Sequence, residues 1–144
     1  TTSEAVGSTD AGMFTRAVVA RTGLFALAKE ETLYFRAFED SDGARFDGAC
    51  SDRVIGEAPA ARWWSITIYG ADNYLIETQE NRYSIGSNDV GSAINFVISR
   101  EAEGIWLPSA DGPFSLTMRL YNPATAVYEN LATTPLPQIM REAC

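Results

Sequence analysis

The chain has 144 residues, of which 46% are hydrophobic and 21% charged, the balance of a globular chain with a single core. Its formal net charge of −8 argues against binding to nucleic acid or to an anionic membrane surface. No stretch of the sequence has the roughly 18 consecutive apolar residues that a membrane-spanning helix needs.

Residues 1–8 are small and polar, and we expect them to form a flexible arm before one domain over residues 9–144. The sequence begins at Thr1 without methionine, so we expect a signal peptide, membrane anchor or tag upstream. Apolar residues then recur at three- and four-residue spacing, which predicts an α-helix over about residues 11–28, capped by Thr9 or Asp10.

Beyond the helix, alternating apolar and polar residues separated by frequent turns indicate β-strands of a sandwich or barrel. The predicted strands cover residues 32–38, 53–55, 63–69, 74–76, 82–85, 93–99 and 114–121. Pro135 and Pro137 predict an extended C-terminal run outside a central sheet position, because proline donates no backbone hydrogen bond.

Alternation gives the strands at 63–69 and 114–121 one apolar and one polar face. If these two strands neighbour the strand at 32–38, their polar residues form one surface. Arginine and tyrosine together suit a carboxylate, a sugar or a phosphate. The alternatives are an ordinary solvated sheet face, or arginines that satisfy the carbonyl groups of internal loops. The candidate ligand-binding residues of this surface, with Ser65 and Thr67 between them, are Tyr34, Arg36, Trp63, Tyr69, Arg119 and Tyr121.

Three further candidates for ligand binding lie outside these strands, namely Arg82, Tyr83 and Trp106. A tryptophan can stack on a ligand. The alternative is that Trp106 caps the open end of the sandwich, with Pro108 fixing the chain as it leaves a strand.

Carboxylates carry the remaining possibilities for chemistry, because the chain has no histidine and so lacks Ser-His-Asp, Cys-His and His-ligated metal sites. The acidic residues around Gly43 are Glu39, Asp40, Asp42 and Asp47. They lack the spacing of an EF-hand, so we favour a solvated acidic turn over a calcium loop and predict no metal or cofactor. A hydrolase would need a carboxylate pair about 5 to 10 Å apart, and the candidates are Asp72, Glu77, Glu80 and Asp111.

The two cysteines are Cys50 and Cys144, the last residue. A reduced cytosolic pair is one interpretation. The terminal position of Cys144 favours a disulfide, since closing so long a loop stabilises a fold by roughly 4 to 5 kcal/mol in the chain-entropy model. Such a bond persists in an oxidising compartment outside the cytosol.

Four segments together resemble the DUF1214 family of bacterial proteins of unknown function, namely Ala61–Gly70, Asn81–Ser84, Trp106–Pro108 and Gly112–Pro123. The resemblance implies a mainly β fold, a jelly-roll-like antiparallel β-sandwich with one N-terminal helix. It also implies a short stand-alone form with an N-terminal membrane anchor, a periplasmic location and cysteines at these two places. Ile105 departs from the Asn that the family often has, and the family brings no established catalytic residues.

We hypothesise a non-catalytic extracytoplasmic domain that binds a small polar ligand, such as a sugar or a carboxylate, or an envelope protein. The polar face around Arg36 and Arg119 motivates this hypothesis. One alternative is a histidine-free, carboxylate-dependent hydrolase acting on a glycan. Another is a structural or assembly module whose polar face is covered by a second copy.

Overall fold

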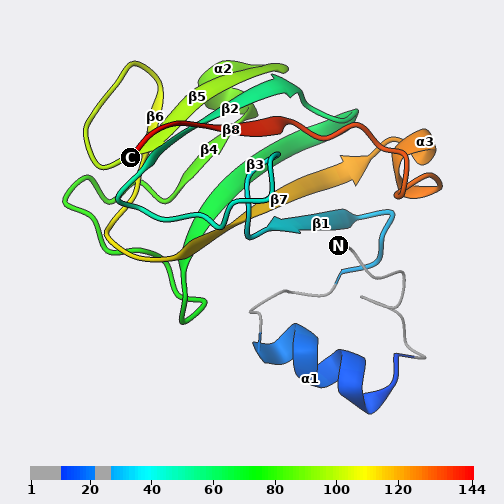
Figure 1. The fold of residues 1–144 in the computed structure, drawn as a ribbon. Helices are drawn as coiled ribbons and strands as arrows, with labels where there is room; N and C mark the ends of the chain where they lie inside the picture. The colour runs from blue at the N-terminus through cyan, green and yellow to red at the C-terminus, as the bar shows by residue number, and fades with distance from the viewer. Residues whose placement is uncertain (1–10, 22–26) are drawn as a thin grey trace.

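Two four-stranded β-sheets face each other in the computed structural model, which describes residues 11–21 and 27–144 (Figure 1). The first sheet has the order β1 (Thr32–Ala37), β7 (Phe114–Pro123), β3 (Ala61–Gly70) and β4 (Ser84–Gly86). The second has the order β6 (Trp106–Pro108), β5 (Ala93–Ser99), β2 (Ser51–Glu57) and β8 (Gln138–Ala143). The predicted mainly β sandwich is therefore confirmed, with β5 and β6 pairing in parallel and jelly-roll connectivity remaining a prediction.

The core lies between the sheets, where alternate residues of each strand point inward. On β3 the buried apolar residues are Trp64, Ile66 and Ile68, as the alternation predicts. Phe114, Leu116, Met118 and Leu120 of β7 are buried beside them. The second sheet contributes Val54, Ile94, Phe96 and Ile98, so both sheets bury their apolar faces against one another.

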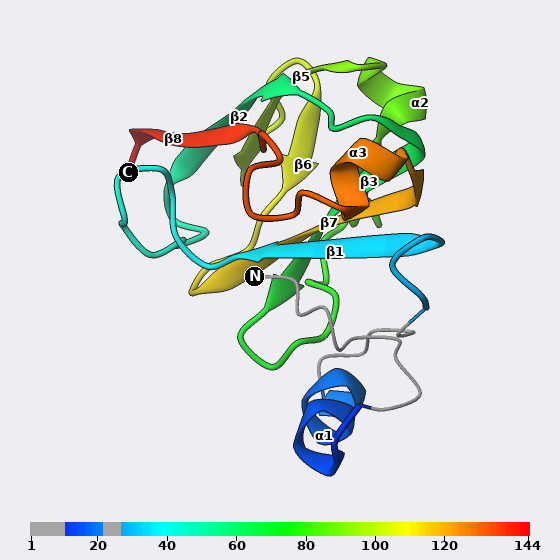
Figure 2. The same ribbon diagram turned by 90° about the vertical axis from the view of Figure 1, so that its right-hand side faces the viewer.

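The predicted N-terminal helix is present as α1 (Met13–Arg21), and it is shorter than the predicted 11–28. Leu27 and Ala28 are not helical, because the carbonyl of Ala28 accepts hydrogen bonds from the backbone of Glu31 and Thr32 in a turn that leads into β1. Both views place α1 outside the sandwich, beyond β1 (Figures 1 and 2). The predicted arm at 1–8, the predicted cap at Thr9 or Asp10, and residues 22–26 lie outside the described residues.

Most predicted strands are confirmed, and the strand at 74–76 is wrong. Asp72 accepts a hydrogen bond from the backbone of Tyr74, and Asn73 has a φ of 68°, so the chain turns away from the sheet. Only an isolated bridge between Tyr69 and Leu75 remains. The prediction also missed two four-residue helices, α2 (Ser87–Val90) and α3 (Thr125–Tyr128).

The C-terminal run ends in β8, which pairs with β2 at the edge of its sheet, so the prediction of a non-central position is confirmed (Figure 2). The disulfide between Cys50 and Cys144 joins the end of β8 to the start of β2. Within residues 11–21 and 27–144, no helix is long and apolar enough to cross a membrane.

Gly48 marks a close approach between two loops. A β-carbon at this position would lie 1.7 Å from the carbonyl oxygen of Ala110, so the backbone would have to move. We predict that Gly48→Ala lowers the free energy of unfolding by about 1 to 3 kcal/mol in chemical denaturation, as overpacking does. Gly12→Ala is the control, because nothing lies within 4 Å of its added β-carbon. Equal stability of the two variants would contradict this packing.

Candidate functional site

The outer face of the first sheet gathers the predicted arginines and aromatic residues. In the register of β1, β7 and β3, Arg119 lies opposite Tyr34 on one side and opposite Ser65 on the other. Tyr121 lies between Thr32 and Trp63 in the next row. The three strands are therefore neighbours, as the prediction required. We call this surface the arginine face, defined by Tyr34, Arg36, Trp63, Ser65, Thr67, Tyr69, Arg119 and Tyr121.

Arg119 lies across the middle of the arginine face and is held by neutral groups. Its Nη1 donates a hydrogen bond to Thr67 Oγ1 at 3.0 Å, and its Nη2 donates to the hydroxyl of Tyr69 at 2.6 Å. The guanidinium carbon is 5.6 Å from the ring centre of Tyr69 and 5.9 Å from that of Tyr34. These contacts fix the plane of the guanidinium without neutralising its charge.

Arg36 approaches the same face from β1, the edge strand. Its Nη2 donates hydrogen bonds to Asn73 Oδ1 at 3.0 Å and to Ser115 Oγ at 3.2 Å. Its Nε is buried and has no hydrogen-bond partner. Burial lowers the pKa of Arg36, Tyr69 opposes that shift, and the positive charge of Arg119 lowers the pKa further. The half-buried guanidinium of Arg36 is therefore poorly compensated.

No carboxylate pairs with either arginine in the described part of the chain. The ion pairs found there use Arg53, Arg82, Arg100 and Arg141 instead. Arg36 and Arg119 are both half-buried, and their partners are hydroxyl and amide oxygens. The guanidinium groups of Arg36 and Arg119 therefore favour the binding of an anion, because a partly buried charge is stabilised by an opposite charge nearby.

Aromatic side chains border these charges. The rings of Trp63 and Tyr121 are 5.3 Å apart and tilted by 53°. Tyr34 is buried, and this burial raises the pKa of its hydroxyl group, with Tyr121 acting in the same direction and Arg119 opposing. The small polar residues between them, among them Ser65 and Thr67, are buried too.

Arg82, Tyr83 and Trp106 are not brought to the arginine face. Nη1 of Arg82 donates a hydrogen bond to the carbonyl of Trp106 at 3.0 Å, which links the chain before β4 to β6 of the other sheet. The indole of Trp106 donates to the carbonyl of Ser99 at 2.9 Å, and the hydroxyl of Tyr83 donates to Asn81 Oδ1. These contacts give Arg82 and Trp106 roles in joining elements of the sandwich.

A cavity of about 860 Å³ lies beside the turn that follows β3. Three of the predicted candidate carboxylates line it, namely Asp72, Glu77 and Asp111, and Glu80 does not. We call it the end cavity, and its other lining residues are Gly70, Ala71, Tyr74, Leu75, Ile76, Tyr83, Ala110 and Pro113. Tyr83 is therefore a residue of this cavity and not of the arginine face.

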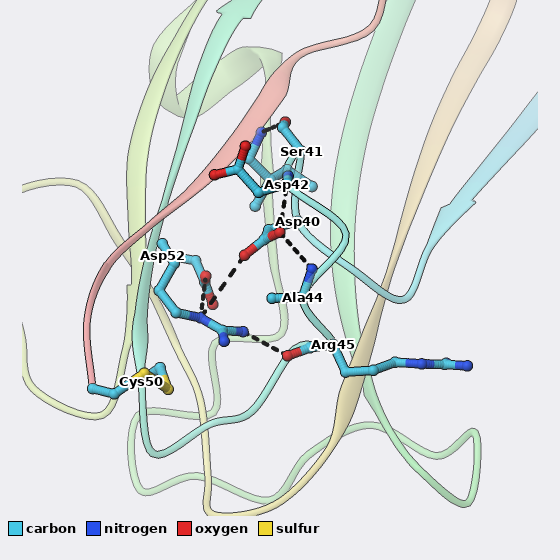
Figure 3. Close-up of polar contacts among 10 residues, drawn as sticks. Asp40, Ser41, Asp42, Ala44, Arg45, Cys50 and Asp52 are labelled. Atoms are coloured by element: carbon cyan, nitrogen blue, oxygen red, sulfur yellow. Dashed lines mark hydrogen bonds and ion pairs between the residues drawn. A yellow bond between two sulfur atoms is a disulfide. The ribbon is translucent and has the colours of Figure 1, made fainter.

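Two carboxylates converge in the interior, at the acidic turn between β1 and β2 (Figure 3). Asp40 Oδ1 accepts hydrogen bonds from the backbone N–H groups of Asp42 and Ala44, and these two bonds stabilise the turn. Asp52 is fully buried and neither of its oxygens has a hydrogen-bond partner. Arg141 of β8 lies 3.5 Å from Asp52 and 3.9 Å from Asp40, so this buried carboxylate cluster ties β8 to the acidic turn and to β2.

Sequence reasoning missed Asn73 and Asp52 as members of these clusters. Asp52 shares the inward side of β2 with Val54, so an acid at a core position of an alternating strand was the available signal. Asn73 follows Gly70 in a turn, where asparagine is common for local reasons, and nothing there indicates a contact with Arg36. No group of three or more potential metal ligands occurs among the described residues.

The fold and these clusters define a disulfide-linked β-sandwich domain with an arginine-rich sheet face. The chain belongs to the DUF1214 family, described as a protein family of unknown function, whose model matches residues 31–125. The VPA0106 protein of Vibrio parahaemolyticus has a similar crystal structure, with a TM-score of 0.73, 27% identity and coverage of 92% of this chain and 36% of that chain. No curated protein matches the sequence.

A second solved structure with some similarity is a putative uncharacterised protein from Burkholderia cenocepacia. It has a TM-score of 0.48 and 19% identity, and the match covers 79% of this chain and 29% of that chain. The chain thus spans about a third of the length of the solved structures that it matches.

Proposed function

We propose that this domain is a non-catalytic binding module that takes a small carboxylate-bearing ligand, such as a sugar acid, on the arginine face. The observation that carries the proposal is the pair of half-buried guanidinium groups, Arg36 and Arg119, whose hydrogen-bond partners are all neutral. A carboxylate would supply the missing negative charge and accept the planar donor fork of arginine. The tyrosine and tryptophan rings beside it suit the apolar side of a sugar ring.

We further propose that the domain works outside the cytosol. The disulfide between Cys50 and Cys144 supports this location, since such bonds persist in oxidising compartments. A periplasmic module of this kind would bind its ligand without transforming it.

The test is a titration of the protein with glucuronate, citrate and glucose, followed by calorimetry and by the melting temperature. We expect glucuronate or citrate to raise the melting temperature, because a ligand that binds the folded state stabilises it. Arg119→Gln should weaken that affinity about tenfold or more, which corresponds to losing about 1.4 kcal/mol of binding free energy. Arg36→Gln should act in the same direction.

Arg62→Gln is the matched control, because Arg62 lies on β3 as well, is exposed and loses the same charge. It should leave the affinity unchanged. Circular dichroism at the titration temperature establishes that each variant is folded. If no carboxylate shifts the melting temperature, or if Arg119→Gln binds as tightly as the unaltered protein, the proposal is wrong.

A further inference from the structure

Arg36 and Arg119 are diagonal neighbours on the arginine face. In the register of β1 and β7, Arg119 pairs with Tyr34, and Arg36 pairs with Thr117 in the next row of the same face. The β-carbons of diagonal neighbours in an antiparallel pair are about 7 Å apart, which long side chains span easily. The two guanidinium groups can therefore reach a common part of the face.

Both guanidinium groups reach the row that Tyr69 and Ser115 form where they pair across β3 and β7. Nη2 of Arg119 donates to the hydroxyl of Tyr69 at 2.6 Å, and Nη2 of Arg36 donates to Ser115 Oγ at 3.2 Å. Burial lowers the pKa of Arg36, and the positive charge of Arg119 lowers it further, as a short separation requires. Two positive charges thus converge on one row of the sheet.

Hydrogen-bond donors dominate this part of the arginine face. A guanidinium group has donors only. The hydroxyl groups of Thr67 and Tyr69 each accept a hydrogen bond from Arg119, so each keeps its own hydrogen as a donor, and the hydroxyl of Ser115 does the same toward Arg36. Carboxylate oxygens are acceptors only, so they match this arrangement.

The charges of Arg36 and Arg119 require two negative charges for neutrality. No carboxylate in the described part of the chain pairs with either arginine. Aromatic rings lie near both guanidinium groups, with the ring centre of Phe38 5.1 Å from Arg36 and that of Tyr69 5.6 Å from Arg119. A ring contact leaves the N–H edge of a guanidinium group for hydrogen bonds in its plane, which is the geometry that a carboxylate takes.

We propose that the ligand of the arginine face is a dicarboxylate with a short spacer, one carboxylate on Arg36 and the other on Arg119. This inference rests on the proposed function, because it names the class of ligand that the same face binds. It narrows the ligand from any small carboxylate to one with two negative charges. A monocarboxylate neutralises one arginine and leaves the other without an opposite charge, so it binds more weakly.

The experiment compares succinate with succinamate, in which a neutral amide replaces one carboxylate, by calorimetry at about pH 7.5, where carboxyl groups are ionised. We expect succinate to bind about tenfold or more tightly, since it adds one charge-assisted interaction. Arg36→Gln and Arg119→Gln should each bring the two affinities together. Arg62→Gln is the control and should keep the full advantage of succinate, because Arg62 is exposed on β3 and is not part of the arginine face.

Nuclear magnetic resonance of the unaltered protein gives a second measurement that needs no folded variant. Succinate should shift the side-chain Nε–H signals of both Arg36 and Arg119 with the same dissociation constant. A shift confined to one of the two arginines would overturn the inference.

The outcomes separate the two proposals. If succinate and succinamate bind equally and both depend on Arg119, the carboxylate site stands and the dicarboxylate is wrong. If neither probe binds, and glucuronate and citrate also fail, the proposed function itself is wrong. If inorganic phosphate binds as tightly as succinate, the face selects any doubly charged anion, and the assignment to two carboxylates is wrong.

Discussion

Reduction of the disulfide is expected to lower the free energy of unfolding by about 4 to 5 kcal/mol. Cys50 and Cys144 are 94 residues apart in sequence, so the bond constrains nearly two thirds of the unfolded chain. It also ties the end of β8 to the start of β2, where β8 has no second neighbour in its sheet. We expect the reduced protein to lose β8 before it loses the rest of the sandwich.

Urea denaturation with and without a phosphine reductant measures this effect. The control is Cys144→Ser, which should have the lower stability from the start and should not respond to the reductant. Mass analysis of the unreduced protein should show two hydrogens fewer than the sequence requires. A loss below about 1 kcal/mol on reduction would contradict the expectation that this bond stabilises the fold.

Replacement of Arg141 by methionine is expected to lower the free energy of unfolding by about 3 kcal/mol at pH 7. Arg141 provides the ion pair to Asp52, whose side chain is fully buried and has no hydrogen bond in the described part of the chain. Without this partner, a buried carboxylate would have no opposite charge. Arg53→Met is the matched control and should lower the free energy of unfolding far less, because its partner Glu142 is exposed.

The pH dependence of the stability of the Arg141→Met variant follows from Asp52. Burial raises the pKa of Asp52, Asp40 acts in the same direction, and Arg141 lowers it. A carboxyl group whose pKa is raised by folding stabilises the protein fully below its unfolded pKa, and this contribution is lost as the pH rises through the folded value. Arg141→Met removes the opposing charge, so its free energy of unfolding should rise more steeply than that of the unaltered protein as the pH falls from 7.

Asp52→Asn in the Arg141→Met background tests the cause. It should recover part of the stability at pH 7 and remove most of the added dependence on pH, because a neutral amide then replaces the fully buried carboxyl group and Asp40 is the carboxylate that remains beside it. Chemical denaturation at pH 7 and at about pH 4.5 gives both quantities. An unchanged pH dependence in the double variant would show that a group other than Asp52 is responsible.

Much of the arginine face was predictable from sequence alone. The alternation in β3 and β7 assigned Trp64, Ile66 and Ile68 to the core and left Trp63 and Tyr69 on the other face. The period of a strand is a local property, so it can be read along the sequence. The same reasoning failed at 74–76. This short apolar run follows a turn in which the side chain of Asp72 accepts a hydrogen bond from the backbone of Tyr74.

The sequence by itself determined the strand faces, the absence of histidine and the position of a cysteine at the last residue. The tertiary structure alone decided that Arg36 reaches Asn73, that Arg141 covers Asp52, and that three scattered carboxylates line one cavity. The physical reason is that these contacts depend on strand order and register. Both are set by how two sheets pack around a shared core, and neither leaves a periodic signal along the chain.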